Sequence, residues 1–196
     1  MATVVKNFED LDLSKQYTYS DYLLWQFSER VELIRGWIKK MSPAPNRAHQ
    51  TLLFNLTMNI GKYANNVPCK MFFAPFDVRL PIKSKKKDTT VVQPDFCIVC
   101  DKSKLDDQGC NGAPDLIVEI LSPSNARHDL DTKFNLYEEA GVQEYWIVQP
   151  QSKTILIYVL ENDRYIGLKP FGEDQIAAGR LFPEMKIDVN EVFMNV

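Results

Sequence analysis

The chain has 196 residues, which suits one sizeable domain better than two. Hydrophobic residues make up 45% of it and charged residues 25%, the composition of an ordinary globular protein. The formal net charge of -3 argues against a generally cationic protein that coats nucleic acid. A nuclease stays possible, because the charge that matters there is local and a bound divalent metal reverses the sign of an acidic pocket.

The chain carries no signal for a membrane or for secretion. No run approaches the roughly 18 apolar residues that are needed to cross a bilayer, so we expect no membrane partner. The first residues, MATVVKNFEDLDLSK, are acidic and mixed, whereas a signal peptide has a basic start and an apolar middle. Four cysteines in a chain of this length do not indicate a disulfide scaffold. A reducing, cytoplasmic setting is therefore the default expectation.

The N-terminal part of the chain predicts a lead-in, a short helix and a hairpin. Residues 1–18 are expected to be loosely ordered, and a single domain should follow over residues 19–196. Ser20 can cap a short helix that carries aromatic residues. Residues 31–41 then predict a hairpin that turns at Arg35-Gly36.

Two longer helices and six strands are predicted after this hairpin. Asn46 offers the N-cap of the first helix, whose apolar residues recur at helical spacing: Leu52, Leu53, Leu56, Ile60 and Tyr63. The second helix is predicted over residues 129–140, ending at Gly141, with an apolar stripe of Leu130, Phe134 and Tyr137. The strands are predicted over residues 71–80, 91–100, 115–121, 143–148, 154–160 and 164–169. This order favours an α/β (α+β) domain, a mixed β-sheet core flanked by helices.

Two acidic residues lie in segments that the pattern would otherwise bury. Asp95 follows Pro94 in an apolar strand, and Glu119 lies inside the segment DLIVEIL. An isolated ionised carboxylate in such a strand is costly unless it is paired or binds a metal. A divalent cation held between Asp95 and Glu119 would remove their repulsion and supply a Lewis acid. Alternatively, one or both acids cap a helix, pair with an arginine or point out of the sheet.

A resemblance extends over most of the chain. The segments PDFCIV and GAPDLIVEILSPSNARHDLDTKFNLYEEAGVQEYWIVQP, with VELIRGWIKKMSPAPNRAHQ and APFDVRL before them, resemble the Uma-type family of restriction endonucleases. That family belongs to the PD-(D/E)XK nuclease superfamily. The match is dense over residues 93–150, where the LSPS turn, the start of the second helix and the AGVQEYWIV strand are specific. The PD dipeptide alone is not.

The resemblance implies a restriction-endonuclease-like sheet whose core strands carry Asp95 and Glu119 as metal ligands. The superfamily pattern places a lysine two residues after the glutamate, but here that position is Leu121. In this family a lysine of the following helix is expected to substitute, and Lys133 is the matching residue. Its ammonium could orient or activate an attacking water and screen phosphate charge. The alternative is an exposed pair with Asp129 at i, i+4, worth only about 0.3–0.5 kcal/mol.

Three further residues are candidates for the same site. Glu32 falls in the ELI-x-G segment that resembles the family, although Arg35 stands where the family commonly has an acid, and a solvated glutamate is equally possible. Asp77 alternates with apolar neighbours in PFDVRL, so it can face the same pocket as Asp95 from an adjacent strand. His49 in the first turn of the long helix could touch a phosphate, or it could simply be partly exposed.

One basic run occurs at a polar hairpin tip, KSKKKD, and consists of Lys83, Lys85, Lys86 and Lys87. It can grip backbone phosphate in a salt-dependent way, or it can be a solvated loop. Cys97-x-x-Cys100 has the spelling of a zinc or redox motif, but residues three apart in a strand point to opposite faces. We therefore expect no zinc site.

Together these features predict an endonuclease that hydrolyses the phosphodiester bonds of nucleic acid, with DNA as the expected substrate and Mg²⁺ or Mn²⁺ as the cofactor. Asp95 and Glu119 would hold the metal, with Glu32 or Asp77 as a further ligand or water-positioning base. The resemblance also implies a homodimer, which suits the cutting of two antiparallel strands. Two other functions stay open: a non-catalytic member of the fold that binds nucleic acid or protein, and a metal-dependent hydrolase of a small phosphorylated molecule.

Overall fold

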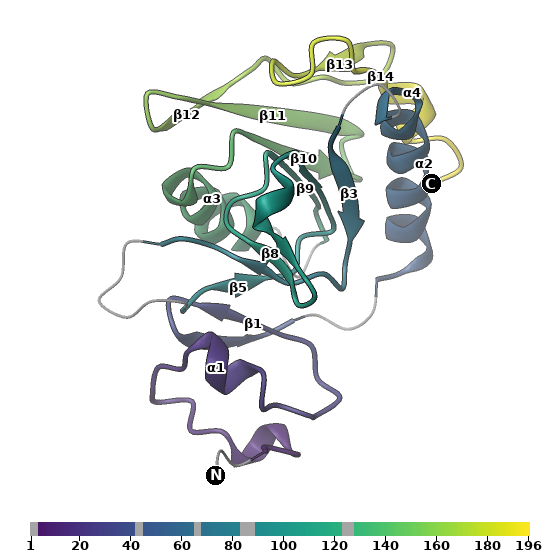
Figure 1. The fold of residues 1–196 in the computed structure, drawn as a ribbon. Coiled ribbons are helices and arrows are strands. Elements are labelled where there is room, and N and C mark those ends of the chain that lie inside the picture. Colours follow the sequence, from purple (N-terminus) through teal and green to yellow (C-terminus); the bar gives the residue numbers. More distant parts are fainter. Residues whose placement is uncertain (1–3, 42–44, 65–67, 83–88, 123–127) are drawn as a thin grey trace.

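The computed structural model describes residues 4–41, 45–64, 68–82, 89–122 and 128–196 (Figure 1). Within these ranges the strands form two six-stranded sheets and a two-stranded one. The first sheet has the order β2-β1-β5-β4-β8-β7 and the second the order β12-β11-β10-β9-β6-β3. Both are mixed, since β4 and β8 pair in parallel in the first sheet and β9 and β10 do so in the second.

The strands are short in the first sheet and longer in the second. The first sheet contains β1 (Val31–Ile34), β2 (Trp37–Lys40), β4 (Val78–Arg79), β5 (Val91–Val92), β7 (Leu105–Asp106) and β8 (Gly109–Asn111). The second contains β3 (Lys70–Phe73), β6 (Phe96–Val99), β9 (Leu116–Ile120), β10 (Glu144–Gln149), β11 (Thr154–Glu161) and β12 (Arg164–Gly167). The small sheet pairs β13 (Ile176–Ala178) with β14 (Lys186–Asp188).

The helices are α1 (Tyr19–Tyr22), α2 (Arg47–Ala64), α3 (Phe134–Ala140) and α4 (Val189–Val192), with a π-helical segment η3 (His128–Lys133) before α3. Two short 3-10 turns complete the set, η1 (Phe8–Asp10) and η2 (Lys102–Lys104). The α2 and α3 helices lie on opposite sides of the second sheet (Figure 1). This arrangement confirms the predicted α/β (α+β) class, a mixed sheet flanked by helices.

The β9 strand is an inner strand of the second sheet, and all five of its residues are buried. Its parallel pairing with β10 requires a crossover connection, which η3 and α3 supply. The alternation of the strand sends Leu116, Val118 and Ile120 into the apolar cluster under α2, and Ile117 into the cluster under α3. Glu119 has the parity of Ile117 and therefore belongs to the side of α3.

Two predicted strands are each divided in the structure, which corrects the sequence analysis. Residues 71–80 form β3 and β4, and residues 91–100 form β5 and β6, so each segment passes from one sheet to the other. The break in the first falls at Pro75 and in the second at Pro94. Proline has no N–H for the strand ladder, so a continuous inner strand cannot run through either position.

The turn and cap chemistry of the N-terminal half is largely confirmed. The hairpin turns at Arg35 and Gly36, both with positive φ (52° and 87°), and Asn46 Oδ1 accepts a hydrogen bond from the His49 N–H at 3.0 Å. The cap of α1 is different from the predicted Ser20. Thr18 caps it in a capping box with Asp21, in which each side chain accepts a hydrogen bond from the other residue's backbone N–H.

The second predicted helix begins with a π-helical segment, which moves its apolar stripe. Leu130 is 41% exposed, whereas Leu136 and Tyr137 are buried. The wider π-turn rotates the residues that precede α3 relative to those inside it, so an α-helical spacing misplaces Leu130. The helix ends as predicted at Gly141, which has the left-handed conformation with φ 85°.

Residues 4–18 contact the first sheet. Leu11 and Tyr17 are buried in an apolar cluster with Leu33 of β1, and Val5 pairs with the backbone beside Trp25. The division between a lead-in and a domain at residue 18 stays a prediction. None of the described helices is long and apolar enough to cross a membrane.

The cysteines follow the strand geometry. Cys97 belongs to the apolar cluster under α3 and Cys100 packs against the one under α2, which confirms that the two side chains diverge. Cys69 and Cys100 form a disulfide that the sequence analysis did not predict. The register pairs Lys70 with Val99, so these cysteines, the next residues along, lie opposite each other.

Candidate active site

Asp95 and Glu119 lie opposite each other at the junction of β6 and β9. The register pairs Phe96 with Val118, so the next residues along are Asp95 and Glu119. The Asp95 carboxylate also accepts a hydrogen bond at 2.8 Å from the N–H of Ile120, the neighbour of Glu119. The fold therefore places the two predicted acids at neighbouring backbone positions, at the end of the β6–β9 pairing.

Lys133 bridges two buried glutamates. Its Nζ lies 2.8 Å from Glu119 Oε1 and 3.1 Å from Glu32 Oε1, and no more than 5% of any of the three side chains is exposed. Two carboxylates without a cation would repel each other strongly in such an environment, so the ammonium is their counter-charge. Glu32 of the first sheet and Glu119 of the second thus both contact the ammonium of Lys133, which lies in η3.

Tyr137 completes this cluster from α3. Its hydroxyl donates a hydrogen bond to Glu119 Oε1 at 2.7 Å, one turn after Lys133 on the same helical face. Burial raises the pKa of the Tyr137 hydroxyl well above its usual range, and the charges of Glu119 and Glu32 add to the rise. Tyr137 therefore stays a neutral donor to the carboxylate.

Asp95 is more open than Glu119 and is held by a helix on the other side of the sheet. His49, in the first turn of α2, lies with Nε2 3.0 Å from Asp95 Oδ2. About 13% of the His49 side chain and 18% of the Asp95 side chain are exposed. A carboxylate can only accept, so Nε2 carries the hydrogen and donates it. His49, a predicted phosphate contact, thus lies beside a predicted metal ligand.

Asp77 is separated from this cluster by Gln93. Asp77 Oδ1 accepts hydrogen bonds from the Tyr22 hydroxyl at 3.1 Å and from Gln93 Nε2 at 2.8 Å. The backbone N–H of Gln93 donates to Glu32 Oε1 at 3.1 Å, and Arg30 Nη2 donates to Gln93 Oε1 at 2.9 Å. Burial raises the pKa of Tyr22, and the nearby Asp77 charge raises it further. Asp77 thus belongs to a network that borders the cluster through one backbone N–H.

Arg35, the departure from the family pattern, has a partner outside the cluster. Its guanidinium forms an ion pair with Glu139 of α3, and its backbone N–H donates to Thr90 Oγ1 at 3.1 Å. The pair connects the β1–β2 turn to the helix that carries Tyr137. The predicted phosphate-gripping lysines, Lys85, Lys86 and Lys87, lie outside the described residues.

The described side chains do not by themselves form a complete shell for a divalent cation. Within the described ranges, no group of three or more histidine, cysteine, aspartate or glutamate side chains is arranged to hold a metal ion. Magnesium, however, is commonly held by one or two carboxylates, with water and substrate phosphate as its other ligands. The two hard oxygen donors Asp95 and Glu119 fit that coordination, whereas the described residues supply no cage made entirely of protein ligands.

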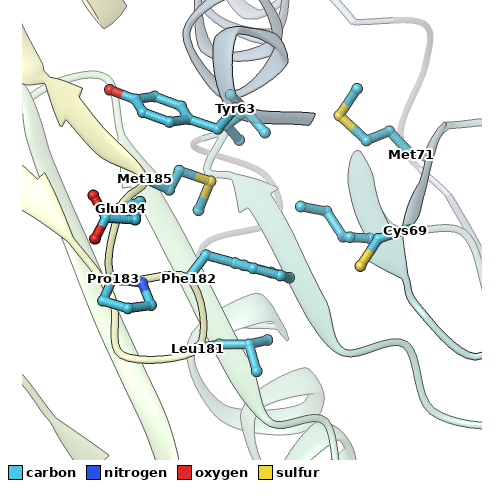
Figure 2. A pocket seen from close by; sticks show the side chains of 10 residues that line it. Tyr63, Cys69, Met71, Leu181, Phe182, Pro183, Glu184 and Met185 are labelled. Atoms are coloured by element: carbon cyan, nitrogen blue, oxygen red, sulfur yellow. The ribbon is translucent and has the colours of Figure 1, made fainter. Parts of the chain in front are cut away.

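A separate cavity of about 320 Å³ lies on the α2 side of the second sheet. Figure 2 shows the side chains that line it, which come from α2, β3 and the segment before β14. They include Tyr63, Met71, Phe182 and Met185. It contains none of the predicted site residues. Its apolar lining does not suit a phosphorylated small molecule, so it gives no support to that alternative function.

The fold is a helix-flanked mixed sheet that carries a buried lysine between two acids. Residues 19–190 match the model of the Uma2 family, described as "Putative restriction endonuclease", and the chain belongs to that family. A crystal structure of a putative nuclease belonging to DUF820, from Anabaena variabilis, is similar over 90% of this chain and 97% of its own. It has a TM-score of 0.69 at 18% identity, which shows the shared fold. An uncharacterized protein of Synechocystis sp., slr1290, is 26% identical over 146 residues, 73% of this chain and 74% of that protein.

Sequence reasoning missed two members of this site, Tyr137 and Gln93, and it expected a different contact for His49. Tyr137 was assigned to an apolar stripe, Gln93 had no assigned role, and His49 was directed toward the substrate. For Tyr137 a signal existed, since a buried tyrosine hydroxyl normally needs a partner and Glu119 needed a donor. For Gln93 and His49 the contacts depend on how distant elements pack, which no local pattern reports.

Proposed function

We propose that the chain is a metal-dependent endonuclease that hydrolyses the phosphodiester bonds of DNA. The observation that carries the proposal is the Glu32–Lys133–Glu119 cluster beside Asp95, with three side chains buried and charged. A protein does not place such groups in its core without cost, and perturbed, buried charges concentrate at functional sites. Family membership supports the same reaction.

Asp95 and Glu119 would hold Mg²⁺ or Mn²⁺ in this proposal. When bound, the cation would polarise a phosphoryl oxygen and lower the pKa of a coordinated water. Tyr137 and Lys133 both bond to Oε1 of Glu119, so they fix the rotation of that carboxylate. Asp77, two hydrogen bonds away from Glu32 through Gln93, would shape the acidic surroundings rather than contact the reacting atoms.

Lys133 and Glu32 act as a pair. In the described arrangement Glu32 accepts hydrogen bonds from Lys133 Nζ and from the Gln93 N–H, which holds the ammonium beside Glu119. From there the ammonium can stabilise negative charge that develops on a phosphate at the two acids. Glu32 therefore orients the lysine, and Lys133 supplies the positive charge that the substrate meets. We also propose a symmetric homodimer, which would present two such sites to two antiparallel strands.

Cleavage of supercoiled plasmid and of single-stranded DNA, with Mn²⁺ or with a chelator, tests the proposal. We expect Mn²⁺-dependent cleavage that falls about 100-fold or more in the Glu119→Ala variant, because the variant loses a ligand and the acceptor that orients Lys133. Glu191→Ala is the matched control, since that glutamate is exposed and pairs with Lys62 on the surface. Absence of cleavage, or equal rates for Glu119→Ala and wild type, would favour the non-catalytic binding alternative.

A further inference from the structure

We infer that His49 is a positioning residue for Asp95, so that it tunes metal binding instead of contacting the substrate; the inference rests on the proposed function. Two hydrogen bonds described for the Asp95 side chain end on the same carboxylate oxygen. Oδ2 receives the Ile120 N–H at 2.8 Å and the His49 Nε2–H at 3.0 Å. These two bonds orient the carboxylate, and in the proposed site Oδ1 would be the oxygen that takes the metal.

The position of His49 is set by the packing of α2. His49 lies three residues before Leu52 and seven before Leu56, so it continues the stripe that Leu52, Leu56 and Ile60 bury against the second sheet. Asn46 caps the helix by accepting the His49 N–H, which fixes the backbone at the same residue. A rigid helix thus delivers the ring to Asp95 without a flexible linker.

The ring has no nitrogen to offer to a phosphate in this arrangement. Nε2 is bonded to Asp95, and Nδ1 is buried, with no hydrogen-bond partner in the described part of the chain. A histidine that reads a substrate phosphate needs an accessible N–H directed at solvent. A histidine that bonds to a ligating carboxylate is instead the outer support that metal sites use to fix their ligands.

Calorimetric titration of Mn²⁺ into the protein without nucleic acid tests this assignment. We expect His49→Leu to weaken Mn²⁺ binding about 10-fold, the effect typical of losing an outer support. His49→Gln keeps an N–H donor at a similar reach and should restore most of the affinity. Gln50→Leu, an exposed neighbour on the same helix turn, is the matched control and should bind as wild type does. Thermal unfolding shows whether each variant is folded.

DNA binding in the presence of chelator is the second measurement. A positioning role predicts equal DNA affinity for His49→Leu and wild type, together with a shift of the Mn²⁺ dependence of cleavage to about 10-fold higher concentration. Weaker DNA binding with unchanged Mn²⁺ affinity would overturn the inference and restore the phosphate contact. A wild-type protein that binds Mn²⁺ but does not cleave would overturn the proposed function alone. One that binds no Mn²⁺ would overturn both.

Discussion

Two glutamates are buried on neighbouring strands of the second sheet, and they are held in different ways. Glu144 on β10 is 0% exposed and Glu119 on β9 is 3% exposed. Glu144 accepts hydrogen bonds from the Trp146 indole at 2.6 Å and from the backbone N–H groups of Arg180 and Leu181 at 2.7 and 2.9 Å. Glu119 is held by the ammonium of a lysine that it shares with a second acid.

The partners distinguish a structural acid from a candidate functional one. The donors to Glu144 are neutral groups that fasten the segment before β14 to the sheet, and a Cβ on Gly179 would lie 1.8 Å from its Oε1. That acid is enclosed by its own donors. Glu119 instead contacts the ammonium that it shares with Glu32, and Asp95 lies near it on the next strand segment. Burial alone therefore does not distinguish the two glutamates, but the shared ammonium and the second acid do.

The largest expected effect on folding is at Glu144. Replacing Glu144 by alanine leaves three buried donors without an acceptor, at about 1–3 kcal/mol each, so we expect at least about 3 kcal/mol lower free energy of unfolding. Denaturant unfolding measures it, with exposed Glu173→Ala as control, which should change the value by less than about 0.5 kcal/mol. Cleavage at a temperature where the variant is folded should persist. A Glu144 variant of normal stability would remove the structural half of the comparison.

A second prediction concerns the ammonium of Lys133. Lys133→Met leaves Glu32 and Glu119 beside each other without their counter-charge, so we expect a loss of about 3 kcal/mol in stability and no detectable cleavage. Plasmid cleavage and denaturant unfolding are the measurements. Lys153→Met, which removes an exposed lysine paired with Glu173, should alter neither. Full cleavage by Lys133→Met would show that the cluster is a structural ion pair.

The smallest effect is expected at Tyr137. Tyr137→Phe removes one buried hydrogen bond, worth about 1–3 kcal/mol. The raised pKa of Tyr137 adds a pH dependence: the unfolded chain loses this proton above about pH 10, while the folded chain keeps it. The stability that the raised pKa contributes is present below pH 10 and is lost as the pH rises further, by up to about 1.4 kcal/mol per unit. Unfolding measured from pH 9 to 11 should therefore decline less steeply for Tyr137→Phe. Equally steep declines in the free energy of unfolding for Tyr137→Phe and wild type would contradict the hydrogen bond between Tyr137 and Glu119.

The sequence was most informative where the chemistry is local. Buried carboxylates in apolar strands identified Asp95 and Glu119, and turn and cap residues placed the β1–β2 hairpin and the end of α3. Lys133 could be predicted only from the family resemblance, because its ammonium reaches Glu119 through a π-helical segment that no α-helical spacing describes. The burial of Glu144 was not predicted from QEYWIV, because its three donors come from its own strand and from a distant turn.

The other elements and contacts that were not predicted have only weak local signals in the sequence. The strands β7, β8, β13 and β14 contain only two or three residues each, too few for an alternating pattern to be recognised. Pro75 and Pro94 did carry a signal, but the apolar residues around them favoured one continuous strand each. The contact between His49 and Asp95 depends on the packing of α2 against the sheet, which is a tertiary property.

The central claim is that Asp95 and Glu119 together hold a divalent cation. The most direct measurement is a calorimetric Mn²⁺ titration of wild type, Asp95→Asn, Glu119→Gln and Glu144→Gln, all shown to be folded at the temperature used. We predict one ion per chain for wild type, an affinity at least about 10-fold weaker for Asp95→Asn and for Glu119→Gln, and a wild-type affinity for Glu144→Gln. Equal affinities in all four proteins, or no binding to the wild type, would contradict the claim.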